Sequence, residues 1–237
     1  GVNKPIRGIY FINSNTGWFV TDTCAVYKTT NGGMNWNRVL LVFYEPIGLA
    51  SIKFLNDSVG IAVGGHQIPG PYNGFYRNFI FKTTNGGNNW NIFYDSQGNS
   101  AFNDVYYNTN KVYVTSAGFS GDIGWWLTGG IYKSTDGGNN FSLGISKGES
   151  TSLSFINPNT GWVNAYYADD SGLSCCYLLK TTNAGINWIL QLKDSIPFTQ
   201  AMKINKLHCV NDSIGYAIAY KSGAKFLKTT NGGTNWI

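Results

Sequence analysis

The sequence predicts an all-β fold, a β-propeller built of four-stranded antiparallel blades. Three observations predict it: a motif that recurs five times, a strand–turn–strand element before each copy, and an unusual composition. Of the 237 residues, 16% are aromatic, 12% are charged and 30 are glycine. Disordered chains lack aromatic residues, and long-helix proteins need more Ala, Glu, Leu and Arg than this chain has.

The recurring motif is a hairpin, Lys-Thr-Thr-Asn-Gly-Gly-x-Asn-Trp in its commonest form. Its lysines are spaced by 54, 51, 47 and 48 residues. Asn or Asp stabilises the turn by bonding its own backbone, the glycines supply positive φ, and the aromatic residue is suited to pack between blades while its N–H finds an acceptor. We assign a structural role to the Asn or Asp, the second glycine and the aromatic residue of each copy: Asn31, Gly33, Trp36, Asn85, Gly87, Trp90, Asp136, Gly138, Phe141, Asn183, Gly185, Trp188, Asn231, Gly233 and Trp236.

A strand, a turn rich in Asn, Ser and Gly, and a second strand precede each hairpin. Each repeat therefore has four strands, expected in the first repeat near Ile9–Ile12, Gly17–Thr21, Ala25–Thr29 and Trp36–Val42. The predicted blades cover about residues 6–42, 49–95, 101–146, 151–193 and 201–237, in a single domain of residues 1–237.

The number of blades in the ring stays open. The fifth repeat stops at Ile237, where its outer strand is expected to begin, and Pro5 makes the N-terminal segment a poor replacement strand. The five repeats form either a five-bladed ring with a frayed last blade or part of a larger ring. Because the chain starts at Gly1 and not at Met, we expect a removed signal or a processed piece.

The hairpin resembles the Asp-box, the bacterial neuraminidase repeat Ser-x-Asp-x-Gly-x-Thr-Trp. The version in this chain is similar to that of secreted bacterial proteins like the photosystem II stability/assembly factor. Only Asp136 keeps the Asp of the parent pattern, and Asn replaces it in the other copies. The resemblance covers all five repeats and implies a propeller, commonly of six to eight blades. Sialidases, xyloglucan-cleaving enzymes, sortilin-type receptors and assembly factors share the motif, so it implies no single function.

Three long loops between the second and third strands of blades carry the candidate ligand-binding residues. The resemblance implies that these loops lie on the face opposite the hairpins, where such propellers usually have their site. Long loops on a rigid scaffold are where binding residues gather, and aromatic residues beside a few polar groups suit a protein or carbohydrate surface. The alternative is that the aromatic residues pack over the loop ends of the blades and bind no ligand. The candidates are Tyr72, Tyr76, Arg77, Asp122, Trp125, Trp126 and Asp169.

Composition and spacing argue against several other classes. The net charge of +5 does not predict nucleic-acid binding, because five lysines belong to the hairpin motif. No uninterrupted apolar stretch approaches the length of a membrane-spanning helix. The cysteines, Cys24, Cys175, Cys176 and Cys209, have no metal-ligand or haem spacing, so no metal or cofactor is expected. Neighbouring Cys175 and Cys176 form either a vicinal disulfide or two buried thiols. Asp122, Asp169 and Asp170, with loop carbonyls, are the groups that a calcium site would use, but the sequence lacks the spacing of an EF-hand.

The chain offers few catalytic groups. A sialidase needs an arginine cluster, but the three arginines are scattered, with Arg7 before the first strand and Arg38 after a hairpin. A glycosidase needs two carboxylates across a cleft, for which Asp122 and Asp169 or Asp170 are the candidates. His208 follows a strand residue and is expected to be a structural hydrogen-bonding residue.

The sequence therefore favours a non-catalytic, secreted or cell-surface bacterial propeller that binds a protein or a glycan through its long loops. The first alternative is a glycoside hydrolase fragment that acts on polysaccharide. The second is a structural subunit of an extracellular assembly that pairs through an open blade edge. Self-assembly and a longer parent chain both stay open.

Overall fold

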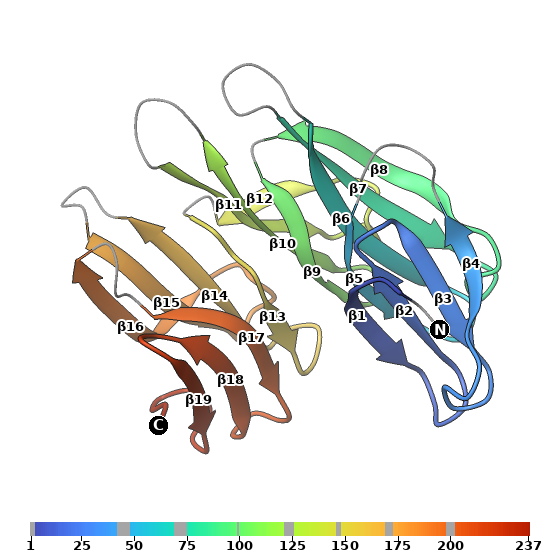
Figure 1. Ribbon diagram of the computed structural model, residues 1–237. Helices are drawn as coiled ribbons and strands as arrows, with labels where there is room; N and C mark the ends of the chain where they lie inside the picture. The colour runs from blue at the N-terminus through green and yellow to red at the C-terminus, as the bar shows by residue number, and fades with distance from the viewer. Residues whose placement is uncertain are drawn as a thin grey trace. The chain divides into compact units, whose positions relative to one another are not determined.

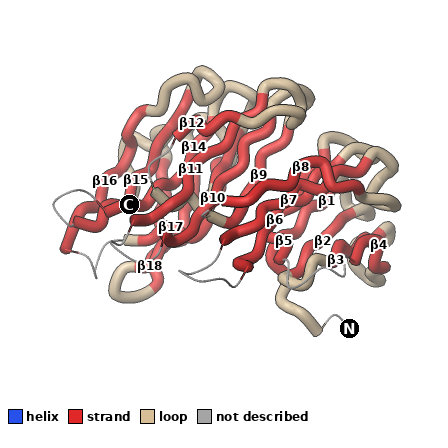
Figure 2. Tube along the Cα trace, turned by 90° about the horizontal axis from the view of Figure 1, so that it is seen from above, coloured by secondary structure: helices blue, strands red, loops and turns tan. Residues whose placement is uncertain are grey.

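The computed structural model describes residues 3–41, 48–68, 75–98, 100–120, 126–145, 148–168, 173–197 and 202–237. In these ranges all regular structure is β-strand and no helix occurs (Figure 2). The strands form four four-stranded antiparallel sheets and one three-stranded sheet, which follow one another along the chain (Figure 1). The all-β prediction of repeated antiparallel blades is confirmed.

Each blade is a meander in which consecutive strands are hydrogen-bonded neighbours. Blade 1 consists of β1 (Ile6–Phe11), β2 (Gly17–Thr21), β3 (Ala25–Thr29) and β4 (Asn37–Leu41). Blade 2 consists of β5 (Gly48–Phe54), β6 (Gly60–Ile68), β7 (Phe75–Thr83) and β8 (Asn91–Gly98). Blade 3 consists of β9 (Ala101–Tyr107), β10 (Val112–Ser120), β11 (Trp126–Ser134) and β12 (Ser142–Ile145). Blade 4 consists of β13 (Leu153–Phe155), β14 (Gly161–Ala168), β15 (Leu173–Thr181) and β16 (Ile189–Pro197). Blade 5 consists of β17 (Lys203–Cys209), β18 (Gly215–Tyr220) and β19 (Ala224–Thr229).

The first strand begins earlier than the sequence predicts. Ile6 pairs with Thr21, and a register shift between Ile6 and Gly8 lets the ladder continue past the expected start at Ile9. Arg7 therefore lies inside β1 and not before it, which corrects the prediction. Its guanidinium lies 3.9 Å from the carboxylate of Asp22.

The same hydrogen bonds close the hairpin in every copy of the motif. In blade 2 the hydroxyl of Thr83 donates to Asn85 Oδ1 (3.1 Å), and the amide of Gly87 donates to Thr83 Oγ1 (2.9 Å). The amide of Asn89 donates to Asn85 Oδ1 as well (2.9 Å). The other four copies repeat this set, with Ser and Asp in place of Thr and Asn in blade 3. The Asn or Asp and the second glycine of each copy thus take part in the hydrogen bonds that close the hairpin.

The aromatic residue of the hairpin contacts its own blade and, in two copies, the core that this blade shares with the blade before it. Its edge-to-face ring contact is with a Phe of the first strand of its own blade in the pairs Phe11–Trp36, Phe54–Trp90 and Phe155–Trp188. Trp90 also belongs to the cluster that includes Trp18 of blade 1, and Trp236 packs against the cluster that includes Trp162 of blade 4. Trp90 Nε1 finds the expected acceptor in Gly87 O (3.0 Å), whereas the buried Trp236 Nε1 has no hydrogen-bond partner.

The turn between the first two strands of a blade is held by one Asn side chain. Asn13 Oδ1 accepts hydrogen bonds from the amides of Asn15 (2.9 Å) and Thr16 (2.8 Å). Asn56, Asn157 and Asn211 make the equivalent pair of bonds in blades 2, 4 and 5. This local geometry explains why the strand–turn–strand element can be predicted from sequence.

The chain divides into two compact units, each with its own apolar core. Unit 1 comprises residues 1–114 and 134–140, and unit 2 comprises residues 115–133 and 141–237. In unit 1 the fully buried Trp18 stacks on Phe54 with ring centroids 3.6 Å apart, in a cluster that includes Ile52. In unit 2 the core gathers around Trp162 and Leu178. Burying one large apolar side chain contributes about 1.5–3 kcal/mol.

Candidate functional site

Most of the loop residues predicted to bind a ligand lie outside the part of the chain that the structure describes. Tyr72, Asp122, Trp125 and Asp169 fall outside it, as does Asp170. Trp126 begins β11, but its side chain is outside the description. The loop site therefore stays a prediction.

Tyr76 and Arg77 are the two candidates whose side chains are described, and both are half-buried residues of β7. As neighbours along one strand they point to opposite faces of the sheet. The guanidinium carbon of Arg77 lies 5.1 Å from the ring centroid of Phe79, so Arg77 packs over its own strand.

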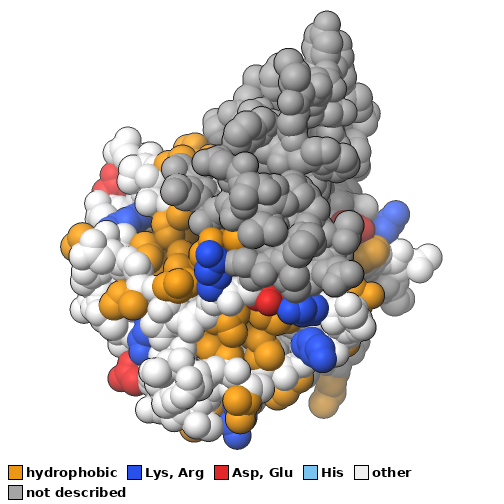
Figure 3. All heavy atoms as spheres, turned by 90° about the vertical axis from the view of Figure 1, so that its left-hand side faces the viewer, with side chains coloured by type: hydrophobic (Ala, Val, Ile, Leu, Met, Phe, Trp, Pro, Cys, Tyr) orange, Lys and Arg blue, Asp and Glu red, His pale blue; other side chains and the backbone are white. Residues whose placement is uncertain are grey.

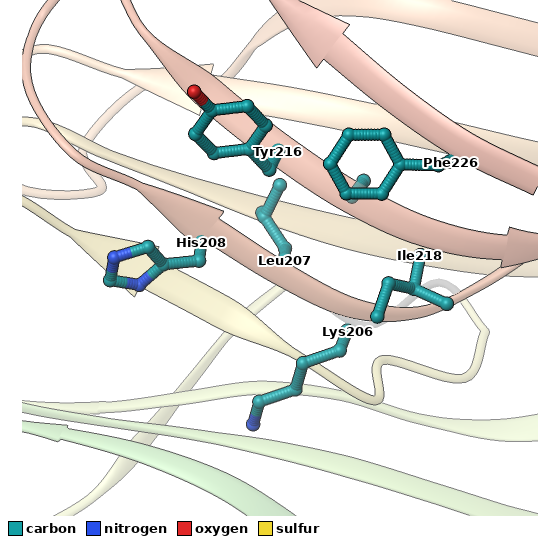
Figure 4. A pocket seen from close by; sticks show the side chains of 7 residues that line it. Lys206, Leu207, His208, Tyr216, Ile218 and Phe226 are labelled. Carbon is teal, nitrogen blue, oxygen red and sulfur yellow. The ribbon is translucent and has the colours of Figure 1, made fainter.

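The described residues form a hollow on one face of blade 5 (Figure 4). Its volume is about 110 Å³, and it is lined by Lys206, Leu207, His208, Tyr216, Ala217, Ile218 and Phe226. The rings of Tyr216 and Phe226 form one wall, with centroids 5.6 Å apart and planes inclined by 28°. Lys228 Nζ lies 6.0 Å from the Tyr216 ring, which places a cation beside the aromatic wall.

The alternation of residues along the strands creates this face. In β18, Ala217 and Ala219 are buried while Ile218 and Tyr220 are exposed on the opposite side. In β17, a register shift between Ile204 and Lys206 adds one residue, so that Lys206 joins the exposed side. We define the open face as the side of blade 5 that carries Lys206, His208, Tyr216, Ile218, Tyr220, Phe226 and Lys228.

The open face combines apolar and cationic groups. Ile218, Tyr220 and Phe226 are large hydrophobic residues that stay exposed. Seen from the side that faces left in Figure 1, hydrophobic side chains gather in patches that border Lys and Arg side chains (Figure 3). Exposed apolar patches with a polar rim are typical of protein interaction sites.

His208 does not have the role that the sequence suggested. We expected a structural hydrogen-bonding residue, but His208 is an exposed residue of β17 that lines the hollow. The reason is the strand alternation, which turns its neighbours Leu207 and Cys209 into the core of unit 2 and His208 outward.

A second group of polar residues surrounds Glu149 in unit 2. Glu149 is buried and pairs with Tyr166 in an isolated bridge, and Lys203 Nζ lies 3.8 Å from its carboxylate. Burial raises the pKa of the Glu149 carboxyl, and the charge of Lys203 opposes this shift. Lys203 Nζ also lies 4.6 Å from the ring centroid of Tyr166, so the cation is held between a carboxylate and an aromatic face.

Asp194 is the other carboxylate held by a lysine in unit 2. Lys221 Nζ donates to Asp194 Oδ1 (2.9 Å), and the amide of Met202 donates to Asp194 Oδ2 (2.9 Å). Met202 directly precedes Lys203, the partner of Glu149. In the described ranges no group of three or more His, Cys, Asp or Glu side chains could hold a metal ion.

The cysteines are buried thiols in the structure. Burial raises the pKa of Cys176 and of Cys209 to about 12, which makes both poor nucleophiles near neutral pH. Among the residues that the structure describes, none forms a helix long and apolar enough to cross a membrane.

Neither a protein-family model nor a characterised protein sequence matches the chain. Solved structures do match it. YCF48 bound to a D1 peptide has a TM-score of 0.58 at 13% identity, over 98% of this chain and 80% of that one. A GH74 xyloglucanase from Xanthomonas campestris has a TM-score of 0.62 at 13% identity, over 98% of this chain. The GH93 alpha-L-arabinofuranosidase of Fusarium graminearum with arabinobiose has a TM-score of 0.61 at 12% identity, over 100% of this chain and 82% of that one.

The fold is that of a β-propeller. At these identities the likeness establishes the fold alone. This propeller chain spans 38% of the length of the xyloglucanase it resembles.

The open face of the propeller's fifth blade is not among the sites that the sequence predicts. The signal was present, because Tyr216, Ile218 and Tyr220 alternate with small residues along one strand. Both sides of this strand carry apolar residues, as in a strand that is covered on both faces, so the pattern alone does not distinguish an open face from a buried one.

Proposed function

We propose that the chain is a non-catalytic propeller that binds a protein through the open face of blade 5. The observation that carries the proposal is the hollow between Tyr216, Ile218 and Phe226, with Lys206 and His208 at its border. Aromatic and aliphatic side chains in such a hollow provide the anchors that dominate protein interfaces. The nearby lysines suit an acidic or carbonyl-rich partner.

The comparisons support a protein ligand. One similar structure is that of YCF48 bound to a D1 peptide, and it covers 98% of this chain. The Asp-box resemblance of the hairpins, including the likeness to assembly factors, agrees with a binding role. We include the long loops in the proposal as a second contact region, with Tyr72, Tyr76, Trp125 and Asp169 as its residues.

The test is a selection of peptides from a displayed random library on the wild-type chain. Selected peptides are then measured against Phe226→Ser, which removes the largest exposed apolar group of the hollow, and against Ile189→Ser. Ile189 is an exposed apolar residue of β16 outside the open face and serves as the matched control. We expect Phe226→Ser to raise Kd by about tenfold or more, while Ile189→Ser leaves it unchanged.

Two results would contradict the proposal. The first is a library that yields no peptide with preference for the wild-type chain over Phe226→Ser. The second is equal weakening by both substitutions, which would indicate a general loss of structure. A glycan array probed with the wild-type chain and with Trp125→Ala tests the glycan alternative, which predicts carbohydrate binding that depends on the loop residue Trp125.

Glycoside hydrolysis is the second candidate function. The likeness to the xyloglucanase and the arabinofuranosidase supports it, as does the raised pKa of Glu149, which is a property of a general acid. It predicts release of sugars from xyloglucan or arabinan that is lost in Glu149→Gln or in Asp122→Asn. Absence of hydrolysis of both substrates by the wild-type chain would count against it.

We further propose that the protein is bacterial and is secreted or held at the cell surface. The Asp-box resemblance and the low content of charged residues support this. Fractionation of the producing cells with an antibody to the chain tests it, and a signal confined to the cytoplasmic fraction would overturn it.

A further inference from the structure

Three of the five hairpins contain an asparagine followed by glycine, a pair that is prone to deamidation. The pairs are Asn31–Gly32, Asn85–Gly86 and Asn231–Gly232. In this reaction the backbone nitrogen of the glycine attacks the side-chain carbon Cγ of the asparagine, a cyclic imide forms, and the side-chain nitrogen leaves as ammonia. The proton of the glycine amide passes to water, and the leaving nitrogen takes up a proton from water. Glycine favours the attack because it has no side chain to hinder the approach of its nitrogen.

The attacking nitrogen is engaged in a hydrogen bond in each of these hairpins. The three asparagines are exposed, so burial does not keep water from them. The amide of Gly86, however, donates to Ser58 O over 2.8 Å. An amide must lose its proton before it attacks, and a deprotonated nitrogen at this distance from a carbonyl oxygen is repelled by it. The same bond runs from Gly32 to Asn15 O (2.8 Å) and from Gly232 to Ser213 O (2.9 Å).

The carbon that is attacked is held as well. Asn85 Oδ1 accepts hydrogen bonds from the hydroxyl of Thr83 (3.1 Å) and from the amide of Asn89 (2.9 Å). Attack converts the planar Cγ to a tetrahedral centre, which displaces Oδ1 from its two donors. The asparagines of the other two hairpins have the equivalent bonds. The imide therefore forms only after the hairpin has opened.

The preceding blade fastens two of these hairpins. Trp18 Nε1 of blade 1 donates to Gly86 O over 3.2 Å, and Lys180 Nζ of blade 4 donates to Gly232 O over 2.9 Å. The first contact lies within unit 1 and the second within unit 2. Each contact holds the carbonyl group of the glycine whose nitrogen would attack, so each opposes the opening of its own hairpin. Closure of the two hairpins therefore depends on different side chains.

The hairpin of blade 3 shows that one product of the reaction fits the turn. Water opens the imide to aspartate or to isoaspartate, in which the main chain runs through Cγ. Asp136 has the place of the asparagine in blade 3, where its carboxylate accepts bonds from Ser134 Oγ (2.7 Å) and from the amide and side chain of Asn140 (3.0 and 2.8 Å). Isoaspartate adds a methylene carbon to the main chain, which moves the next amide out of register with its acceptor. An aspartate hairpin therefore closes again, whereas an isoaspartate hairpin does not.

We propose that Asn31, Asn85 and Asn231 are deamidation sites that the closed hairpins protect. A hairpin that opens forms the imide, and the isoaspartate product prevents it from closing again. The reaction consumes water and releases ammonia, and it needs no enzyme or cofactor. The inference goes beyond the proposed function, because it concerns how long each blade persists and not what the chain binds.

The first experiment compares deamidation in the folded chain and in concentrated urea at the same mildly alkaline pH. Trypsin cleaves after the motif lysine, so each of the three hairpins begins a peptide of its own, with residues 29–38, 83–111 and 229–237. Mass spectrometry then locates each conversion of an amide to a carboxylate. We expect all three sites to react more slowly in the folded chain by about tenfold or more. In urea, Asn183 should react more slowly than the three sites, because the methyl group of Ala184 hinders the attack.

The second experiment opens the two fastened hairpins separately. Trp18→Phe and Lys180→Met remove the donors to the hairpins of blades 2 and 5, respectively. Trp18→Phe should raise the rate at Asn85 by about fivefold, which corresponds to the loss of one hydrogen bond, and leave the rate at Asn231 unchanged. Lys180→Met should do the reverse. Each variant is thus the control for the other.

Circular dichroism establishes that each variant is folded. Thr83→Val and Thr229→Val, which remove the hydroxyl that binds the asparagine, replace a variant that is not. Equal rates in the folded chain and in urea would overturn the inference. So would an equal rise at Asn85 and Asn231 in both variants, because the opening would then be that of the whole chain and not of one hairpin. Unchanged rates at both sites in every variant would show that the hairpin contacts do not control the reaction and would overturn it as well.

Discussion

The indole N–H of Trp18 in blade 1 donates to the carbonyl oxygen of Gly86 in the hairpin of blade 2, over 3.2 Å. The two residues are far apart in sequence, and the bond joins one blade to the next. Because Trp18 is fully buried, water cannot replace the bond. The contact therefore links the turn geometry of one repeat to the packing of the repeat before it.

Substitution of Trp18 by Phe should destabilise unit 1 by about 1–3 kcal/mol, because it removes a buried hydrogen bond and leaves space beside Phe54. Urea unfolding of the variant measures the shift in midpoint. Trp36→Phe is the control, since the Trp36 side chain is half-buried at the hairpin of blade 1 and is expected to cost less than about 1 kcal/mol. Equal shifts in the two variants would mean that the bond to Gly86 does not stabilise the contact between blades.

Gly232→Ala should be more destabilising than Gly32→Ala, although the two glycines have nearly the same φ of 69° and 70°. Both variants incur the left-handed penalty of about 1–2 kcal/mol. An added Cβ at Gly232 would also lie 2.6 Å from Asp212 O, whereas at Gly32 the nearest atom is at 3.2 Å. Ala184, which occupies the equivalent position of blade 4 at a φ of 59°, shows that the backbone alone tolerates alanine. Unfolding midpoints that fall together for both variants would refute the steric argument.

The stability of the hairpin in blade 3 should decrease at low pH, because the Asp136 carboxylate becomes protonated. The backbone amide of Asn140, the hydroxyl of Ser134 and the side chain of Asn140 lower the pKa of this carboxyl to about 2. Its stabilising contribution is present above the ordinary Asp pKa of about 3.8 and is lost as pH falls toward about 2. Asp136→Asn should remove this dependence, and Asn85→Asp should introduce it into blade 2. Parallel acid unfolding curves for the wild type and Asp136→Asn would contradict the prediction.

Glu149 should produce the opposite dependence on pH. Burial raises the pKa of its carboxyl, so the folded state favours the protonated form and loses stability as pH rises above the ordinary Glu pKa. Glu149→Gln stays neutral, and its stability relative to the wild type should therefore increase from about pH 4 to about pH 7. Lys203→Met should steepen the dependence, because it removes the cation 3.8 Å from the carboxylate. A difference between Glu149→Gln and the wild type that does not change with pH would exclude this account.

The blades themselves were predictable because the contacts that define them are local. The Thr83–Asn85 and Asn13–Thr16 hydrogen bonds join residues a few positions apart, and each repeat supplies them from its own sequence. The sequence pattern predicts the start of β1 too late, because the register shift after Ile6 depends on the partner strand β2. The orientation of Trp36 toward Phe11 likewise depends on a strand outside the hairpin.

The repeat, the four-stranded unit and the turn chemistry can be predicted from the sequence, since they follow from residue type and spacing within one blade. The burial of Val26 and Leu178 and the exposure of Phe226, at the same position of the repeat, depend on tertiary packing. Tertiary packing also decided that His208 lines a hollow and that Glu149 meets Lys203. The physical reason is that strand alternation specifies two faces for every blade, whereas the burial of each face depends on which surface packs against it.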